Sequence, residues 1–161
     1  GICKKQTSRS VRGASVVECV LQEERAGLHE LETYNQFSRR LESLKTEVWG
    51  IVDICRNDGL VMVGYGAARS GTTLISQLEL GKVLQFIVDD DPSKQGKCSP
   101  GDLIPVKPRA VLSDTQPAYA LILAWVHSKK IISSNKGYLE KGGKFISCFP
   151  FFEIVSGVAD A

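Results

Sequence analysis

The sequence has few cysteines, few histidines and little net charge, and each shortage argues against a class of protein. Its five cysteines are odd in number and widely scattered, with no C-x-x-C pair among them. This pattern indicates reduced thiols in a cytoplasmic setting, and it argues against a disulfide framework or a metal site. The formal charge of +2 is too small to predict a nucleic-acid partner or an anionic membrane surface.

Long apolar runs are also missing. No stretch approaches the roughly 18 consecutive apolar residues that a membrane span needs, and the start has no apolar signal-peptide core. We therefore expect a cytoplasmic protein without membrane or nucleic-acid partners. Because the chain begins with glycine rather than methionine, we expect a processed chain or a piece of a larger protein.

Catalytic motifs are lacking as well. The sequence contains neither a nucleophile elbow nor an H-E-x-x-H motif, and no acidic pair stands in a catalytic setting. His127 is the one histidine after residue 59, and a ligand contact or a helix start is favoured over a general base for it. Otherwise we expect no catalytic residue, and the chain resembles the binding half of an enzyme.

What is present is a globular composition, with 43% hydrophobic and 24% charged residues in 161. Residues 1–58 are expected to form a tail or edge strand (1–13), a helix over 15–26 stopped by Gly27, and a long helix over about 33–57. Thr33 and Gln36 have the spacing of a capping box at its start. The long helix either covers one face of a sheet, which is favoured, or links or dimerises domains.

Residues 59–161 alternate apolar strands with helices, which predicts parallel strands covered on both faces. The expected helices are 72–80 (stopped by Gly81), 108–113 and 128–139; the expected strands are 60–63, 83–88, 103–106, 119–124 and 144–148. We expect an α/β fold: a Rossmann-like, doubly wound, mostly parallel five-stranded sheet that binds a nucleotide.

A glycine-rich turn follows the first strand. Such a turn lets the backbone approach a ligand closely, and the amide groups at the start of the next helix, expected at Gly71, attract phosphate. Arg69 occupies the third glycine position of the dinucleotide fingerprint, so the turn predicts a nucleotide without specifying which one. A turn without a ligand is the alternative. The residues expected to bind the ligand here are Gly64, Tyr65, Gly66, Ala67, Arg69, Ser70, Gly71 and Thr72.

Further ligand contacts are expected where other parallel strands end, because ligands bind beyond the carboxyl ends of such strands. Asp89 or Asp90 could hold a ribose diol or simply form a solvated turn, and Lys94 could meet a phosphate. Trp125 could stack on a base or line the core, with the core slightly favoured. His127 completes the expected set.

Several strings recur in the order found in one enzyme family. Gly64-Tyr65-Gly66-Ala67 precedes a V-D-D-x-P-x-K-Q-G string over residues 88–96, and Gly142-Gly143-Lys144 follows. Over residues 14–155 the chain resembles the C-terminal domain of the sugar C-methyltransferases, which modify keto-deoxysugars carried on a nucleoside diphosphate.

The resemblance implies a three-part enzyme with an N-terminal zinc-binding segment, a central S-adenosylmethionine domain and this C-terminal part. The C-terminal part would help to hold the nucleotide-sugar, while methyl donor and proton-abstracting residues lie in the central domain. The chain alone would then bind no cofactor and methylate nothing, and the missing domains of the same polypeptide would be its partners.

The chain departs from the family at the expected site. Where the family has approximately G-Y-G-A-P-A-K-G-N-T, this chain has Ala68, Ser70 and Thr72 in place of the proline, lysine and asparagine. A family Ala-Trp-Asn-Phe run is replaced by one that ends in Val126 and His127. Two alternatives stay open: a free-standing module that binds NAD or coenzyme A, and a structural domain that dimerises through the long helix.

Overall fold

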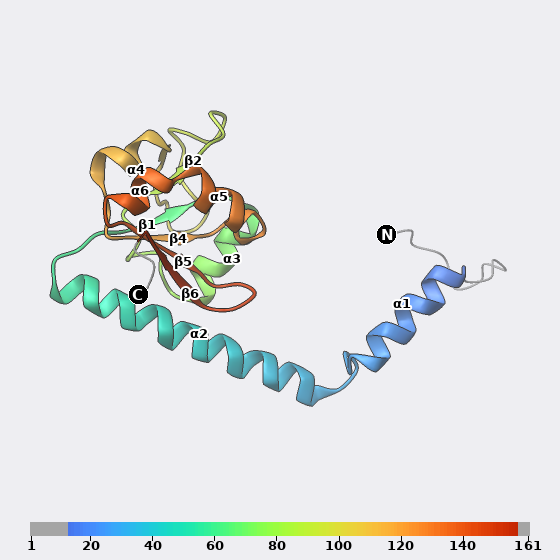
Figure 1. Cartoon of the computed structure of the whole chain (residues 1–161). Helices are drawn as coiled ribbons and strands as arrows, with labels where there is room; N and C mark the ends of the chain where they lie inside the picture. Colours follow the sequence, from blue (N-terminus) through green and yellow to red (C-terminus); the bar gives the residue numbers. More distant parts are fainter. Residues whose placement is uncertain (1–12, 158–161) are drawn as a thin grey trace. The chain divides into compact units, whose positions relative to one another are not determined.

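The computed structural model describes residues 13–157 (Figure 1). The chain divides into two compact units, Gly1–Leu41 and Glu42–Ala161, and each is described by itself. The tail or edge strand expected over residues 1–13 lies, apart from Gly13, outside the described residues. The boundary within α2 differs from the domain boundary expected after residue 58, which stays a prediction.

The N-terminal unit consists of α1 (Ala14–Arg25) and the first part of α2 (Leu31–Asn57). The first helix confirms the prediction, and the amide of Gly27 donates to the carbonyl of Glu24 just after the helix. The expected capping box is wrong, because α2 begins two residues before Thr33. The Thr33 amide instead donates to the carbonyl of Glu30 at 3.2 Å, within the first turn.

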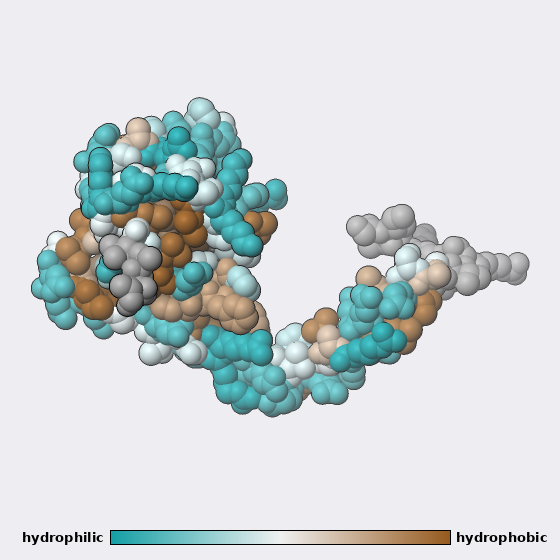
Figure 2. Space-filling model, in the orientation of Figure 1, coloured by the Kyte–Doolittle hydropathy of each residue, from teal (hydrophilic) through white to brown (hydrophobic). Residues whose placement is uncertain are grey.

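Apolar side chains of the N-terminal unit remain exposed. Figure 2 shows hydrophobic residues along α1 beside hydrophilic ones. Within residues 13–41, the large apolar side chains that are exposed are Val16, Val17, Leu21, Leu28, Leu31, Tyr34 and Phe37. No helix within residues 13–157 has the length and hydropathy needed to cross a membrane.

The second unit is an α/β domain built on one six-stranded sheet in the order β3-β2-β1-β4-β5-β6. Five strands are parallel and β6 is antiparallel to β5. The strands are β1 (Met62–Tyr65), β2 (Ile87–Asp89), β3 (Val106–Pro108), β4 (Tyr119–Ile122), β5 (Lys144–Ser147) and β6 (Glu153–Ser156). The first five follow the order of doubly wound nucleotide-binding sheets.

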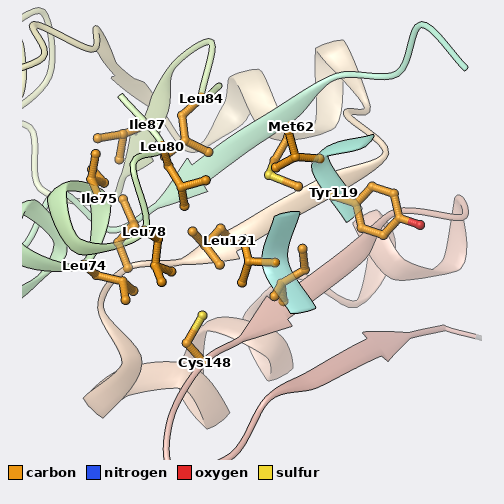
Figure 3. Close-up of a cluster of buried hydrophobic side chains, with 14 of the residues drawn as sticks. Met62, Leu74, Ile75, Leu78, Leu80, Leu84, Ile87, Tyr119, Leu121 and Cys148 are labelled. Carbon is orange, nitrogen blue, oxygen red and sulfur yellow. The ribbon is translucent and has the colours of Figure 1, made fainter. Parts of the chain in front are cut away.

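The helices of this unit lie on both faces of the sheet. They are α3 (Arg69–Gln77), α4 (Ala110–Thr115), the 3-10 helix η1 (Trp125–His127), α5 (Ser128–Ser134) and α6 (Lys136–Glu140). One hydrophobic cluster joins the sheet to α3, which contributes Leu74 and Ile75 (Figure 3). The second half of α2 adds Val48 and Val52 to this cluster. The other joins the opposite face to α4, α5 and α6. The favoured hypothesis for the long helix, a cover for the sheet, is confirmed for this half of it.

The central strands are buried on both faces, which explains why they appear in the sequence as continuous apolar runs. Alternate residues of β4 point to opposite sides: Leu121 packs in the cluster with α3, and Ile122 in the cluster with α4 to α6. The same alternation places Ile146 and Phe145 of β5 on opposite faces.

Several sequence predictions for this unit need correction. The sheet has six strands rather than five, because β6 is a mostly exposed edge strand without the apolar run that marks the others. β2 and β3 begin later than expected, at Ile87 and Val106. α3 spans residues 69–77, and it is followed by Glu79 in the left-handed conformation (φ +56°) before Gly81 is reached. The helix expected over residues 128–139 is broken at Asn135 into α5 and α6.

Candidate functional site

The glycine-rich turn joins β1 to α3 at the carboxyl edge of the sheet. Gly66 has φ +90°, and a Cβ at this position would lie 2.5 Å from the Cβ of Ala124, which follows β4. Both the conformation and the space therefore require glycine. Because β1 lies between β2 and β4, the turn stands where the strand order changes direction, which is the usual ligand position in such sheets.

A second glycine of the turn packs the helix against the sheet. A Cβ on Gly71 would lie 2.9 Å from the Cβ of Leu123. In the dinucleotide fingerprint the third glycine has this packing role, and the sequence placed Arg69 at that position. Gly71, two residues later, fills the role here. The expected helix start at Gly71 is wrong, since α3 begins at Arg69.

The start of α3 is open to an acceptor from outside the helix. Its N-cap residue is Ala68, which provides no side-chain hydrogen bond to the first turn. The amide groups at the start of a helix carry a partial positive charge and favour an anion. Arg69, the first residue of the helix, is exposed and adds a full positive charge at this point.

Asp89 ties the end of β2 to the turn. Its carboxylate is 8% exposed and accepts hydrogen bonds from the Ala67 amide (2.6 Å) and the Asp91 amide (2.8 Å). It also forms an ion pair with the Lys94 Nζ at 3.2 Å. Both carboxylate oxygens are thus engaged within the protein, so Asp89 positions the turn, and Asp90 is the better placed of the two acids to meet a ligand.

Asp90 has an exposed carboxylate within a chain of polar contacts. The phenol of Tyr65 donates to it at 3.3 Å, and the Arg109 Nε lies 3.4 Å from it. The buried Asn135 amide in turn donates to the Tyr65 oxygen at 3.2 Å. Burial, with a smaller contribution from the Asp90 charge, raises the pKa of Tyr65, which therefore stays a donor at neutral pH.

A pocket with charged and hydroxyl-bearing walls opens beside this network, and we call it the Asp90 pocket. It lies between the turn, the end of β2 and α5. Its lining residues are Tyr65, Gly66, Ala68, Asp89, Asp90, Lys94, Ala124, His127, Lys130, Ile131 and Ser134. It brings Asp90 and His127 to one cavity, although they are 37 residues apart in the chain.

A second pocket lies on the other side of the turn, between α3 and the loop that follows β2, and we call it the α3 pocket. Its interior is apolar and its rim carries cations. Its lining residues are Gly66, Ala67, Ala68, Arg69, Gly71, Thr72, Ile75, Ile87, Lys94, Lys97, Cys98, Ser99, Pro100, Val106 and Leu123. The two pockets share Gly66, Ala68 and Lys94.

Three of the expected site residues line neither of these pockets. Gly64 is buried within β1, where a Cβ would lie 2.7 Å from the Leu123 Cδ1. Ser70 is half-buried on α3 and is not part of either lining. The Trp125 ring is half-buried and packs against Phe149 with 5.2 Å between ring centroids, and the choice between core lining and base stacking stays a prediction. The other expected residues line at least one of the two pockets.

Sequence reasoning missed several residues of the two pockets and of the Tyr65–Asp90 network. Arg109 follows the carboxyl end of β3, so the rule that located Asp90 could have found it. Lys130 lies near the start of α5 and Ser134 is its last residue, and both line the Asp90 pocket. No sequence pattern could have identified Asn135, because only the packing of α5 on β1 places its amide against Tyr65. No group of three or more His, Cys, Asp or Glu side chains within residues 13–157 is placed to hold a metal ion.

Comparison with known proteins identifies a family. Residues 1–150 match the family described as the C-methyltransferase C-terminal domain. The chain belongs to this family. It is also 34% identical over 143 residues to C-methyltransferase NovU of Streptomyces niveus, an alignment that covers 88% of this chain and 34% of NovU.

As a C-methyltransferase C-terminal domain, the chain spans about a third of the length of this curated relative. The matched range contains the glycine-rich turn, the whole Asp90 pocket and the whole α3 pocket. The family resemblance carried by the turn and by the string over residues 88–96 is therefore confirmed.

Proposed function

We propose that this chain is the part of a sugar C-methyltransferase that binds a nucleoside diphosphate sugar, and that it does not catalyse methyl transfer alone. The Rossmann-like sheet presents the ligand at its carboxyl edge. S-adenosylmethionine and a structural zinc would be held by other parts of a longer cytoplasmic protein, in a pathway that builds deoxysugars.

One observation carries the proposal: two pockets flank a glycine turn and meet at Ala68, next to the open start of α3. A diphosphate at Ala68 would face the first amide groups of α3 and the side chains of Arg69 and Lys94. The diphosphate joins a nucleoside to a sugar, and each of these two groups would have one cavity beside it. Backbone amides and an arginine are the usual partners of a diphosphate in proteins.

His127 has a binding role in this proposal. Its side chain is exposed and lines the Asp90 pocket together with Lys130. Both side chains can donate hydrogen bonds to a ligand that enters this cavity. The position suits a contact with the ligand, and we assign no proton transfer to His127.

The proposal is tested by thermal unfolding of the chain with thymidine and uridine diphosphate sugars, NAD, coenzyme A and S-adenosylmethionine. A ligand at 100 times its dissociation constant stabilises the folded state by about 2.7 kcal/mol. We expect a diphosphate sugar to raise the melting temperature and S-adenosylmethionine to leave it unchanged. Stabilisation by NAD or coenzyme A but by no diphosphate sugar would favour a free-standing nucleotide-binding module instead.

We also propose a protein partner for the N-terminal unit, because its exposed apolar side chains include Leu31, Tyr34 and Phe37. The remaining domains of the methyltransferase are the expected partner, and a second copy of the chain bound through the long helix is the alternative. Sedimentation velocity tests the second copy. A concentration-dependent dimer that Phe37→Ser disrupts would support the second copy, whereas a monomer at all concentrations would exclude it.

A further inference from the structure

The connection between β2 and β3 has an unusual form for parallel strands. Such crossovers normally carry a helix that covers the sheet. Here residues 90–105 contain turns and one isolated bridge between Cys98 and Pro105, with no helix. The loop is held by backbone hydrogen bonds, including those from Gly96 to Val106 (2.9 Å) and from Ser99 to Ile104 (2.8 Å).

The missing helix explains the α3 pocket. Ile87 of β2 and Val106 of β3 face a region that a crossover helix would fill, and both line the pocket together with Ile75 of α3. The cavity is therefore a slot between α3 and the loop, with aliphatic side chains inside. Thr72 and Ser99 provide hydroxyl groups at its walls. The Ser99 oxygen accepts a hydrogen bond from the Ile104 amide at 3.1 Å, and its own proton can still be donated.

The Asp90 pocket differs from this slot in polarity. The carboxylate of Asp90, the imidazole of His127 and the ammonium group of Lys130 all line it. Sugar hydroxyls both donate and accept hydrogen bonds, and burying them without partners is costly. A planar base has apolar faces and needs few polar contacts at its edges, which suits an aliphatic slot.

From this contrast we propose that the α3 pocket receives the nucleobase and that the Asp90 pocket receives the sugar. The inference rests on the proposed function, and it adds the direction in which the ligand lies. The diphosphate then crosses Ala68, where the two pockets meet. Lys94 lines both cavities and pairs with Asp89, so its ammonium group is fixed near this crossing point.

Two substitutions that fill one pocket each test the assignment. Thr72→Phe places a ring in the α3 pocket, and Thr73→Phe is its control, because Thr73 is exposed on the same helix and lines neither pocket. Ser134→Phe places a ring in the Asp90 pocket, with Ser133→Phe on the same helix as its control. Thermal unfolding checks that each variant is folded before binding is measured.

The probes are uridine and thymidine diphosphates and their glucose conjugates, measured by calorimetry. We expect Thr72→Phe to weaken the diphosphate and its conjugate alike, by about tenfold or more. Ser134→Phe should leave the free diphosphate unchanged and remove the additional affinity that glucose gives. Neither control should alter any dissociation constant.

Three outcomes overturn the assignment. If Thr72→Phe leaves the affinity for the free diphosphate unchanged, the base does not bind in the α3 pocket. If Ser134→Phe abolishes that affinity, the base binds in the Asp90 pocket, and the proposed positions of base and sugar are reversed. Equal affinity of the unmodified chain for a diphosphate and its conjugate removes the sugar from the Asp90 pocket. If the unmodified chain binds none of the probes, the proposed function itself fails, which is a different result from the first three.

Discussion

The Asp89 carboxylate accepts a hydrogen bond of 2.6 Å from the backbone amide of Ala67, which joins the end of β2 to the glycine-rich turn. The carboxylate of a strand end thus fixes the backbone of the turn from the neighbouring strand. Lys94 balances its charge from the loop. The shape of both pockets depends on this contact, because both are lined by residues of the turn.

We predict that Asp89→Asn destabilises the fold by about 2–4 kcal/mol, because a buried carboxylate with three partners is lost and Lys94 is left without its counter-charge. Urea unfolding measures the change. Asp114→Asn, an exposed position on α4, should alter stability by less than about 0.5 kcal/mol. Equal stability of the two variants would show that Asp89 does not hold the turn.

Arg69→Ala should weaken a diphosphate ligand by roughly 1.5–3 kcal/mol, the range of a hydrogen bond to a charged group. Lys141→Ala is the control, since Lys141 precedes β5 at the opposite edge of the sheet and also removes one positive charge. Calorimetry with a nucleoside diphosphate measures both. An unchanged dissociation constant in Arg69→Ala would remove Arg69 from the site.

Gly71→Ala should cost about 1–3 kcal/mol of folding free energy, because the added methyl group would meet the Leu123 side chain at 2.9 Å. Gly137→Ala gives the matched comparison: it also lies in a helix, and nothing is within 4 Å of the added atom. There alanine should be neutral or stabilise by about 0.5–1 kcal/mol. The packing role of Gly71 is refuted if the two variants unfold at the same urea concentration.

Stability should fall in alkaline solution because of Cys148. Burial raises the pKa of its thiol to about 12 in the folded chain, so the folded state keeps the proton while the unfolded state releases it above about pH 8.5. The stabilisation is complete below that pH and declines by roughly 1 kcal/mol per pH unit as pH rises toward 12. Urea titrations at pH 8.5 to 10 should give a shallower decline for Cys148→Ala; identical slopes would contradict this origin.

Most of the fold could be predicted because strands that are buried on both faces of the sheet appear in the sequence as continuous apolar runs. β1 and β4 appear as continuous apolar runs, and Gly27 stands just beyond the end of α1 as expected. β6 shows no such run, since its residues are mostly exposed and only its pairing with β5 defines it. The break at Asn135 was also invisible, because it accompanies a contact with Tyr65, 70 residues earlier in the chain.

The sequence predicted where the candidate site lies, but not the role of each residue in it. The rule for parallel strands brought the turn, Asp90 and His127 to one edge, and the structure joins them in one cavity. It could not separate Asp89 from Asp90, because adjacent residues at the end of a strand point in opposite directions and only packing decides which is buried. Nor could it show a second pocket, which exists because residues 90–105 form no helix.

The loop over residues 90–105 determines where this part of the chain can accept substitutions. Its backbone is held by hydrogen bonds within the loop and to β2 and β3, and the side chains of Lys97 and Cys98 are exposed, so substitutions at these two positions need not disturb the sheet. A helix in the same place would have to keep an apolar face against β2 and β3. Without a helix in the crossover, side chains at exposed loop positions such as Lys97 and Cys98 can be replaced with little loss of folding stability.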